Sequence, residues 1–523
     1  MDVFRDDIVP AFMFAGIVNG DDIRVLQAGD YARLALEGCD RLRVDSRCEG
    51  GVQSLERDPA FEPEIFGKPH FGHPARSKQA LEAVSSIHDV RCTERQMTLR
   101  EALTRERTAE AALLAGPIAM LALGWRALAE ANIALPDGII RIVAQAALCV
   151  FAMHLLARVI VPRARPEILP LVGLLACTGL IFVIRLAPSA ADQQANWLAV
   201  GTAALGLGMV AGRQPRRMKQ LTYTSGLLAV LTLVATGLFG QTINGARLWV
   251  SLAGQSVQTT EFIKAFLILF LSGYLADAGG ALAVPSGRFA GVSVPGAAYV
   301  LPLALVLAGA VAALALLRDL GSIAILLTLA MALLYAATGR LRFALAGFGL
   351  VLATGVIGYL AFGHVQARVD AWIHPLADPT GSGYQSLQAT YAVNAGGITG
   401  VGVGRGMPTV VPAASTDYIY TAVAEELGLA GATGVALVFL VLIHAGMRVA
   451  AEAYTTYDRY LAAAIALLMG IQAAVIIGGN LRLIPTTGIT LPFVSYGGSS
   501  LVVNLGLVGV LLGISHASRR PLA

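Results

Sequence analysis

Charged residues are scarce in this sequence. Asp, Glu, Lys and Arg make up 14% of its 523 residues, hydrophobic residues make up 56%, and the mean hydropathy is +0.67. A soluble globular protein carries about 25% charged residues, so the composition excludes an ordinary soluble protein. The formal net charge is only +4, which gives no electrostatic basis for binding nucleic acid.

Cysteines and targeting signals are also few. No pair among the five cysteines has the spacing of a zinc site, so we expect free thiols without a catalytic role. The N-terminus lacks a basic segment followed by an apolar core. We therefore expect no cleavable signal peptide, and the first membrane span would direct insertion. The cysteines are Cys39, Cys48, Cys92, Cys149 and Cys177.

Long runs of Ala, Leu, Val and Gly dominate the rest of the chain, and they favour helices over the short alternating segments of a β-barrel. A helix needs about 20 apolar residues to cross a bilayer. The sequence therefore predicts an all-α polytopic membrane protein with about twelve transmembrane helices. The apolar windows are 111–129, 139–161, 168–186, 196–211, 221–240, 262–279, 298–317, 320–338, 342–362, 428–447, 460–479 and 499–516.

Basic residues fall in alternate loops, before the first window and after the second and fourth, as Arg105, Arg163 and Arg217 illustrate. The positive-inside rule places these loops and both termini in the cytoplasm. The opposite loops, including a long one, would then be extracytoplasmic. These are 187–195, 241–261, 363–427 and 480–498.

Residues 1–108 differ in being charged and without sustained periodicity, and we expect a cytoplasmic extension of unknown role. Residues 77–106 have the spacing of a helix. Met97 begins an ordinary basic entry into the first span, so residues 1–96 need not contribute to activity.

The run from Arg482 to Ser500 is rich in Pro, Gly and hydroxyl residues, yet apolar spans flank it. Irregular backbone beside lipid is tolerated only where protein or a wet cavity covers it. This run is therefore predicted to line a site at the membrane surface. Arg482, at its start, is a candidate for binding a phosphate, or an arginine that snorkels to the interface.

The long loop contains Asp378 before Pro379, in a run that continues to Gln385. An ionised carboxylate beside a membrane cavity can act as a general base, although Asp-Pro also marks a simple turn. Asp370 is a weaker candidate. The glycines of 396–406 either let backbone approach a substrate or form a flexible loop, and they lack the Gly-Lys-Ser/Thr of a nucleotide-binding loop.

Other ionisable residues cluster near the predicted outer ends of spans. Glu261 and Lys264 lie three apart and can pair on one helix face, and Arg247 suits a phosphate. Asp319 precedes a span and either caps it or helps to position Lys264 or a metal. Thr416 and Asp417 are candidate caps. Glu425 and Glu426 should face a cavity or a partner.

In their order and spacing these motifs resemble the SEDS family (shape, elongation, division and sporulation), to which RodA and FtsW belong. The resemblance covers the ten-helix body at 166–520, and some actinobacterial members share the two additional helices at 109–165. It implies that Asp378 is catalytic. Thr259 and Arg318 stand where the family usually has Pro. The implied substrate-binding residues are Arg247, Glu261, Lys264, Asp319, Gln385, Glu426, Arg482, Ser495, Gly497 and Gly498.

The resemblance further implies a peptidoglycan glycosyltransferase of the bacterial cytoplasmic membrane, active in elongation or division. It would polymerise lipid II and release undecaprenyl pyrophosphate beside a class B penicillin-binding protein and other cell-wall synthesis proteins. No cofactor is certain, but Mg²⁺ or Mn²⁺ is possible. A lipid II flippase is the alternative, although mid-span ionisable residues such as His154 and His444 are few. A catalytically silent scaffold is a third reading.

Overall fold

The computed structural model describes residues 106–243, 246–252, 254–289 and 292–519. These ranges contain twelve helices of membrane-spanning length and hydropathy, which confirms the predicted fold class. The predicted helix at 77–106 and the start at Met97 lie outside the described residues. The spans are Glu106–Glu130, which includes α4 (Ala115–Glu130), then α5 (Ile139–Ile160), α6 (Ile168–Leu186), α7 (Ala191–Gly212), α9 (Thr222–Phe239), α10 (Thr259–Ala283), α11 (Ala297–Leu316), α12 (Leu320–Thr338), α13 (Leu341–Ala361), α16 (Ile419–Glu452), α17 (Thr456–Asn480) and α18 (Gly498–Ser518).

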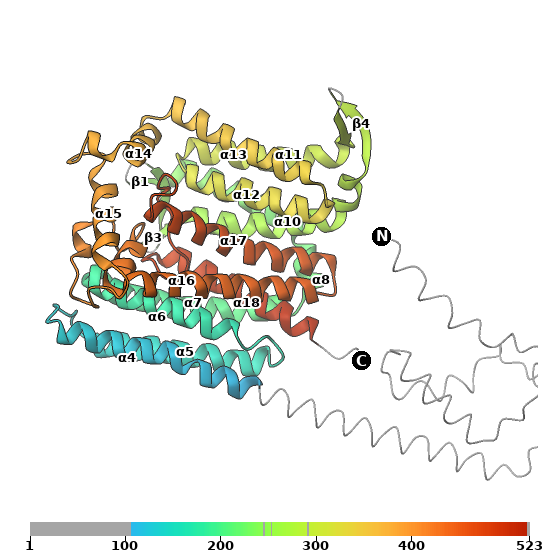
Figure 1. Ribbon diagram of the computed structural model, residues 1–523. Coiled ribbons are helices and arrows are strands. Elements are labelled where there is room, and N and C mark those ends of the chain that lie inside the picture. Colours follow the sequence, from blue (N-terminus) through green and yellow to red (C-terminus); the bar gives the residue numbers. More distant parts are fainter. Residues whose placement is uncertain (1–105, 244–245, 253, 290–291, 520–523) are drawn as a thin grey trace, which may run out of the picture. The chain divides into compact units, whose positions relative to one another are not determined.

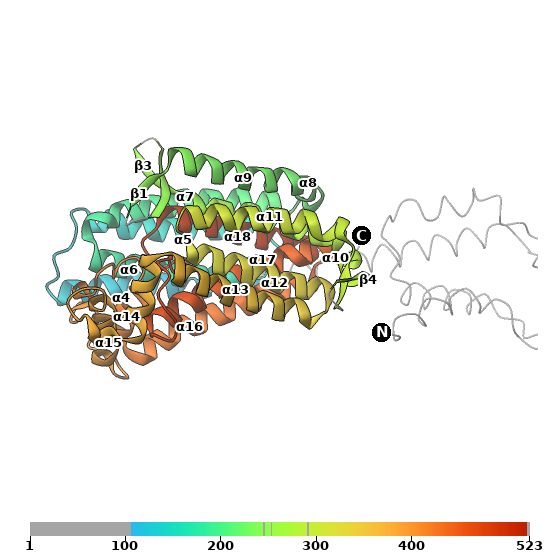
Figure 2. The same ribbon diagram turned by 90° about the horizontal axis from the view of Figure 1, so that it is seen from above.

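Successive spans run in opposite directions, so every second connection falls at the same end of the bundle. Strands β1 (Gln241–Ile243) and β3 (Gln255–Gln258) lie at one end with helices α14 (Gly363–Ile373) and α15 (Tyr384–Gly396). Helix α8 (Pro215–Gln220) and strand β4 (Pro285–Phe289) lie at the other (Figures 1 and 2). We call these the α14–α15 end and the opposite end.

The spans differ in how deeply they are buried. In α6 and α18, 89% and 83% of the most apolar window is buried, against 11% in α13 and 22% in α11. Helices α6 and α18 are therefore central. Helices α11 and α13 present most of their apolar side chains outward, as expected where the neighbour is lipid rather than protein.

Small residues hold the two most closely packed helices together. A Cβ atom at Gly208 of α7 would lie 2.2 Å from the carbonyl oxygen of Gly506 in α18. One at Gly509 would lie 2.1 Å from the carbonyl oxygen of Leu205. Only glycine permits this backbone contact, which is the usual way in which membrane helices pack without a hydrophobic driving force. We call this α7–α18 contact the glycine seam.

Two predicted loops contain regular structure. Residues 241–258 form a three-stranded antiparallel sheet of β1, β2 (Ala246–Leu252) and β3, so the all-α expectation misses this sheet and the hairpin of β4 with β5 (Val292–Pro295). Searching for 20-residue apolar windows cannot detect strands this short. The sequence Asn244-Gly245 between β1 and β2 is a hairpin signal that could have indicated the first pair.

The long loop is also largely structured. It comprises α14, the short 3₁₀ helix η4 (Pro375–Ala377), α15 and a second 3₁₀ helix η5 (Pro408–Val410). Ala389 and Ala392 of α15 form a small apolar core with Val411, Ala414 and Tyr418. Helix α16 begins at Ile419, nine residues before the predicted window, and is kinked at Gly428, where φ is 67°.

Buried polar contacts at the opposite end join the first two spans to each other. Glu110 is fully buried and pairs with Arg107 and with Nδ1 of His154, the latter at 2.6 Å. Arg107 also donates to the carbonyl oxygens of Val161 and Ala164. These contacts tie the first span to the end of α5 and the connection that follows it.

Candidate active site

Asp378 lies directly after η4, and its exposed carboxylate closes a tight turn. It accepts hydrogen bonds from the backbone N–H groups of Gly381 (3.0 Å) and Ser382 (2.7 Å) and from the Ser382 hydroxyl (3.2 Å). The bonds from Ser382, and secondarily the one from Gly381, hold the pKa of the Asp378 carboxyl below its ordinary value. The carboxylate is therefore ionised at neutral pH. The turn and the charge belong to one arrangement, so the turn does not argue against a catalytic role.

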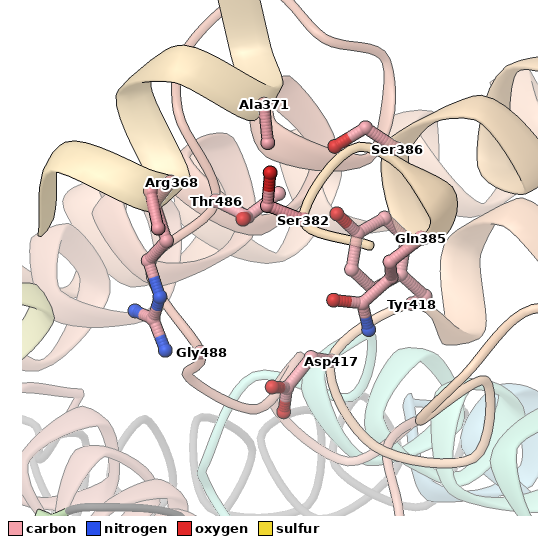
Figure 3. A pocket seen from close by; sticks show the side chains of 10 residues that line it. Arg368, Ala371, Ser382, Gln385, Ser386, Asp417, Tyr418, Thr486 and Gly488 are labelled. Atoms are coloured by element: carbon pink, nitrogen blue, oxygen red, sulfur yellow. The ribbon is translucent and has the colours of Figure 1, made fainter. Parts of the chain in front are cut away.

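A cavity of about 160 Å³ opens beside this turn (Figure 3). It is lined by four parts of the α14–α15 end: helix α14, the turn at Ser382 with the start of α15, the segment 417–418 and the segment 486–488. Ser382 both lines the cavity and holds Asp378. The lining residues are Ala367, Arg368, Ala371, Ser382, Gln385, Ser386, Asp417, Tyr418, Thr486 and Gly488.

Two opposite charges face this cavity. Arg368 comes from α14 and donates to the carbonyl oxygen of Thr487 at 2.9 Å. Asp417 comes from the segment before α16. Burial raises the pKa of the Asp417 carboxyl, against the opposing effects of Arg368 and a hydrogen bond from Thr416. The remaining polar lining is neutral, so the cavity combines one cation and one anion with hydroxyl and amide groups.

Asp417 was predicted as a helix cap, and this prediction is wrong for both Asp417 and Thr416. The cap position of α16 is Tyr418, and no side chain caps the helix. Instead, the Tyr418 hydroxyl hydrogen-bonds with Thr486 and Ser386, which holds the segment against the wall of the cavity. The carboxylate of Asp417 is left at the cavity rather than at the helix end.

The run 482–500 contributes to the cavity only through its first part. Arg482 and Trp372 of α14 are joined reciprocally: Nη2 of Arg482 donates to the Trp372 carbonyl, and Nε1 of Trp372 donates to the Arg482 carbonyl, both at 2.9 Å. Thr486 and Gly488 then line the cavity. Arg482 thus fixes α14 through its Nη2 group, a structural role that the sequence did not indicate.

The later part of this run is internal. The Ser495 hydroxyl donates to the Thr416 carbonyl at 2.5 Å and accepts from the Leu491 N–H at 2.9 Å. The N–H of Gly497 donates to the buried Gln194 side chain. A Cβ at Gly498 would lie 2.3 Å from the Trp197 ring. These three predicted substrate-binding residues brace the loop instead of lining the cavity.

Glu261 and Lys264 form the predicted pair in the first two turns of α10. Oε1 of Glu261 and Nζ of Lys264 are 2.8 Å apart, and both side chains are almost fully buried. The nearby Arg247 in β2 is exposed and donates through Nε to the Gly240 carbonyl. Asp319 caps α12 by accepting from the N–H and hydroxyl of Ser322. Of the two roles that the sequence suggested for Asp319, the structure thus shows the helix cap.

Replacing Lys264 by Met should lower protein abundance. The change leaves the Glu261 carboxylate buried without its partner, which typically costs about 3–5 kcal/mol. Membrane abundance and the thermal unfolding temperature of the detergent-purified protein measure the loss. The double variant Glu261→Gln/Lys264→Met removes both charges and should recover most of the stability. Equal unfolding temperatures for wild type and Lys264→Met would contradict the prediction.

Glu426 has a partner that the sequence analysis missed. Nε of Arg185, in the last turn of α6, lies 3.0 Å from Oε1 of Glu426, and Nη2 donates to the Gly406 carbonyl. Glu425 accepts from the N–H of Met407 at 2.7 Å. An ionisable residue in an apolar span usually has a partner, so Arg185 within its span was the available signal.

The glycine-rich run 396–406 is explained by the kink in α16. The N–H of Leu429 donates to Gly397 and that of Ala430 to Ile398, while Val401 and Gly402 donate to the carbonyls of residues 425 and 426. At Gly400, φ is 82° and a Cβ would lie 2.3 Å from the Glu426 carbonyl oxygen. The glycines thus permit backbone-to-backbone contact within the protein. The sequence had suggested either close approach to a substrate or a flexible loop.

Two departures from the family pattern have local explanations. The hydroxyl of Thr259 contacts the Thr236 hydroxyl at 2.7 Å and donates to the Leu248 carbonyl at 3.2 Å, so it ties α10 to α9 and β2. Arg318 has φ of 64°. Proline cannot adopt this conformation because its ring fixes φ near −65°, so the turn before α12 differs from one built on proline.

Metal binding has no clear set of ligands. No group of three or more His, Cys, Asp or Glu side chains within the described ranges could hold a metal ion. A divalent cation is normally held by several oxygen ligands, and the cavity offers one carboxylate. The residues present do not form a cage for Mg²⁺ or Mn²⁺, and we assign no step to either.

Twelve spans, with the unusual polar residues gathered at one end, define a multi-pass membrane protein. A family model described as a cell cycle protein of the FtsW, RodA and SpoVE type matches residues 166–520. The chain therefore belongs to this family, the SEDS peptidoglycan glycosyltransferase family.

Curated relatives include proteins of more than one name. The chain is 37% identical over 383 residues to the peptidoglycan glycosyltransferase RodA of Mycobacterium tuberculosis, covering 71% of this chain and 81% of that protein. It is 33% identical over 332 residues to a probable peptidoglycan glycosyltransferase FtsW of a Geobacter species, covering 62% and 87%.

Solved structures agree with the fold. A structure described as showing coordination of polymerization and crosslinking by a peptidoglycan synthase complex matches with a TM-score of 0.57 and 25% identity, covering 68% of this chain and 99% of that one. RodA of Thermus thermophilus matches with a TM-score of 0.50 and 24% identity, covering 68% and 98%. This second likeness supports the fold alone.

Proposed function

We propose that the protein polymerises glycan strands from lipid II and releases undecaprenyl pyrophosphate. The main support is the gathering of the candidate residues at the α14–α15 end. Arg185, Lys264, Asp319, Asp378 and Arg482 come from different spans or loops, yet all lie at or beyond the ends of helices on that side. A polymerase needs such a one-sided site, whereas a flippase needs a polar path through the bilayer. Relatives named as peptidoglycan glycosyltransferases add support.

Asp378 is the proposed general base. Its ionised carboxylate would accept the proton of the attacking sugar hydroxyl, and its three hydrogen bonds from Gly381 and Ser382 fix the direction of its oxygen atoms. Cations of the same end, such as Arg247 and Lys264, would stabilise the negative charge of the leaving pyrophosphate. Glu261 positions Lys264 for this role.

A transpeptidase partner fits this activity. The synthase complex among the similar structures is described as coordinating polymerization with crosslinking. By analogy, a class B penicillin-binding protein would crosslink the strands that this protein makes. The relatives carry both names, RodA and FtsW. We therefore propose polymerisation without assigning it to elongation or to division.

Purified protein supplied with labelled lipid II tests this function directly. We expect glycan strands that grow with time, and more of them when the transpeptidase partner is added. Translocation of lipid II across vesicles without any strand formation would instead favour the flippase.

The α14–α15 end should face the outside of the cell, because the basic loops lie at the opposite end. A Thr380→Cys variant should react with a membrane-impermeant maleimide in intact cells, since Thr380 is exposed beside Asp378. Wild type provides the background from Cys39, Cys48 and Cys92, which should be labelled only after permeabilisation. Labelling of Thr380→Cys that also required permeabilisation would overturn the orientation and the mechanism with it.

A further inference from the structure

The cavity beside Asp378 has a chemistry that is unlike that of the cationic groups assigned to the pyrophosphate. Arg368 and Asp417 both line it, together with the side chains of Ser382, Gln385 and Thr486 (Figure 3). A phosphate would gain from Arg368 but would be repelled by Asp417. A metal ion would meet a single carboxylate facing an arginine. A neutral molecule with both hydroxyl donors and oxygen acceptors can use both charges.

The size of the cavity agrees with such a ligand. A single water needs roughly 10–15 Å³ of comparable volume, whereas the cavity holds about 160 Å³. It is therefore large enough for a group of several atoms. Apolar Ala367 and Ala371 line one side of it, and such small surfaces suit the carbon skeleton of a sugar ring.

The walls of the cavity are fixed by contacts from outside it. Arg482 and Trp372 hold α14 against the segment that carries Thr486. Nη1 of Arg368 donates to the Thr487 carbonyl, and Nε2 of Gln385 donates to the Pro412 carbonyl at 2.7 Å. Binding groups held in this way lose little conformational entropy when a ligand enters.

We propose that this cavity is a sugar-binding subsite, in which Asp417 accepts a hydrogen bond from a ring hydroxyl and Arg368 donates to an oxygen atom of the same sugar. The subsite rests on the proposed function and adds to it the place of the acceptor sugar. Ser382 connects the two, because it lines the cavity while its N–H and hydroxyl bind Asp378. A sugar in the cavity would thus lie beside the proposed base.

Two measurements test the subsite, one with substrate and one without. In the first, strand formation from lipid II by Asp417→Asn should fall about 10- to 100-fold, the expected effect of losing a hydrogen bond to a charged group. Asp137→Asn makes the same chemical change at an exposed position between α4 and α5 and should leave the rate unchanged. Ala371→Leu, which narrows the cavity without altering its charge, should also lower the rate.

The second measurement is binding of chitobiose, a neutral disaccharide of N-acetylglucosamine, detected by saturation-transfer NMR on the detergent-purified full chain. We expect a signal with wild type and Asp137→Asn, its loss with Asp417→Asn and Ala371→Leu, and no displacement by inorganic pyrophosphate. Displacement by pyrophosphate would overturn the proposal in favour of an anion site. If Asp417→Asn and Ala371→Leu both bind chitobiose and form strands as well as the wild type does, the proposal is overturned as well.

The two measurements separate the subsite from the proposed function. If wild type makes no strands but binds chitobiose through Asp417, the subsite stands and the polymerase assignment fails. If wild type makes strands and Asp417→Asn makes them equally well, the polymerase assignment stands and the subsite fails. A folded state for each variant is checked by its elution as a single species and by its thermal unfolding temperature.

Discussion

Replacing Asp378 by Asn is expected to stop glycan-strand formation while leaving the protein in the membrane. Losing a general base typically lowers the rate by about 10²–10⁴-fold. Asn keeps the size of the side chain but carries only one acceptor oxygen, so it cannot satisfy all three donors from Gly381 and Ser382. Because the turn is exposed and lies outside the spans, membrane abundance should change little.

Strand formation from labelled lipid II, at matched protein amounts, measures this effect. Asp137→Asn again provides the matched control. The lowered pKa of Asp378 also predicts how activity depends on pH. The active carboxylate form is present above that pKa, so activity should be lost only as the pH falls through it, below the ordinary pKa of Asp. Near-normal strands from Asp378→Asn would eliminate it as the base and move attention to Asp370.

Replacing Arg185 by Leu is expected to destabilise the protein strongly. Glu426 is 1% exposed, so removing its partner leaves a buried charge, at a cost of about 3–5 kcal/mol. The Gly406 carbonyl also loses its donor. Thermal unfolding and membrane abundance should both fall. Arg185→Lys keeps the charge but cannot contact both Glu426 and the Gly406 carbonyl as the guanidinium does. Its unfolding temperature should lie between those of Arg185→Leu and wild type.

A double variant makes this test specific. Arg185→Leu/Glu426→Leu removes both charges and should be more stable than Arg185→Leu alone, because no unpaired carboxylate remains. If the single and double variants unfold at the same temperature, the ion pair does not account for the loss. The effect would then come from the packing of the long Arg185 side chain against its neighbours.

Local patterns in the sequence predicted the features that depend on neighbouring residues. The twelve spans follow from runs of about 20 apolar residues, and the Glu261–Lys264 pair follows from spacing of three along a helix. The cap at Asp319 was one of two local alternatives, and the structure selects it. Each of these needs only one segment of chain.

The missed features join segments that are far apart. Arg185 and Glu426 are 241 residues apart, and Arg368 meets the carbonyl of Thr487 across 119 residues. Asp417 satisfied a local rule for capping, and only the fold of the long loop turns it toward a cavity. A single sequence offers no signal for which of several ionisable residues will meet, so the cavity could not be predicted from it.

The glycine seam has a consequence for biogenesis. Helix α7 is the fourth span to be made and α18 is the twelfth, so α7 leaves the ribosome long before its closest neighbour exists. Until then, its glycines expose backbone to lipid or to other helices, and the central contact of the bundle must form after synthesis rather than during it. Interrupted synthesis should therefore yield inserted but unassembled chains, which makes the last span a checkpoint for cellular quality control.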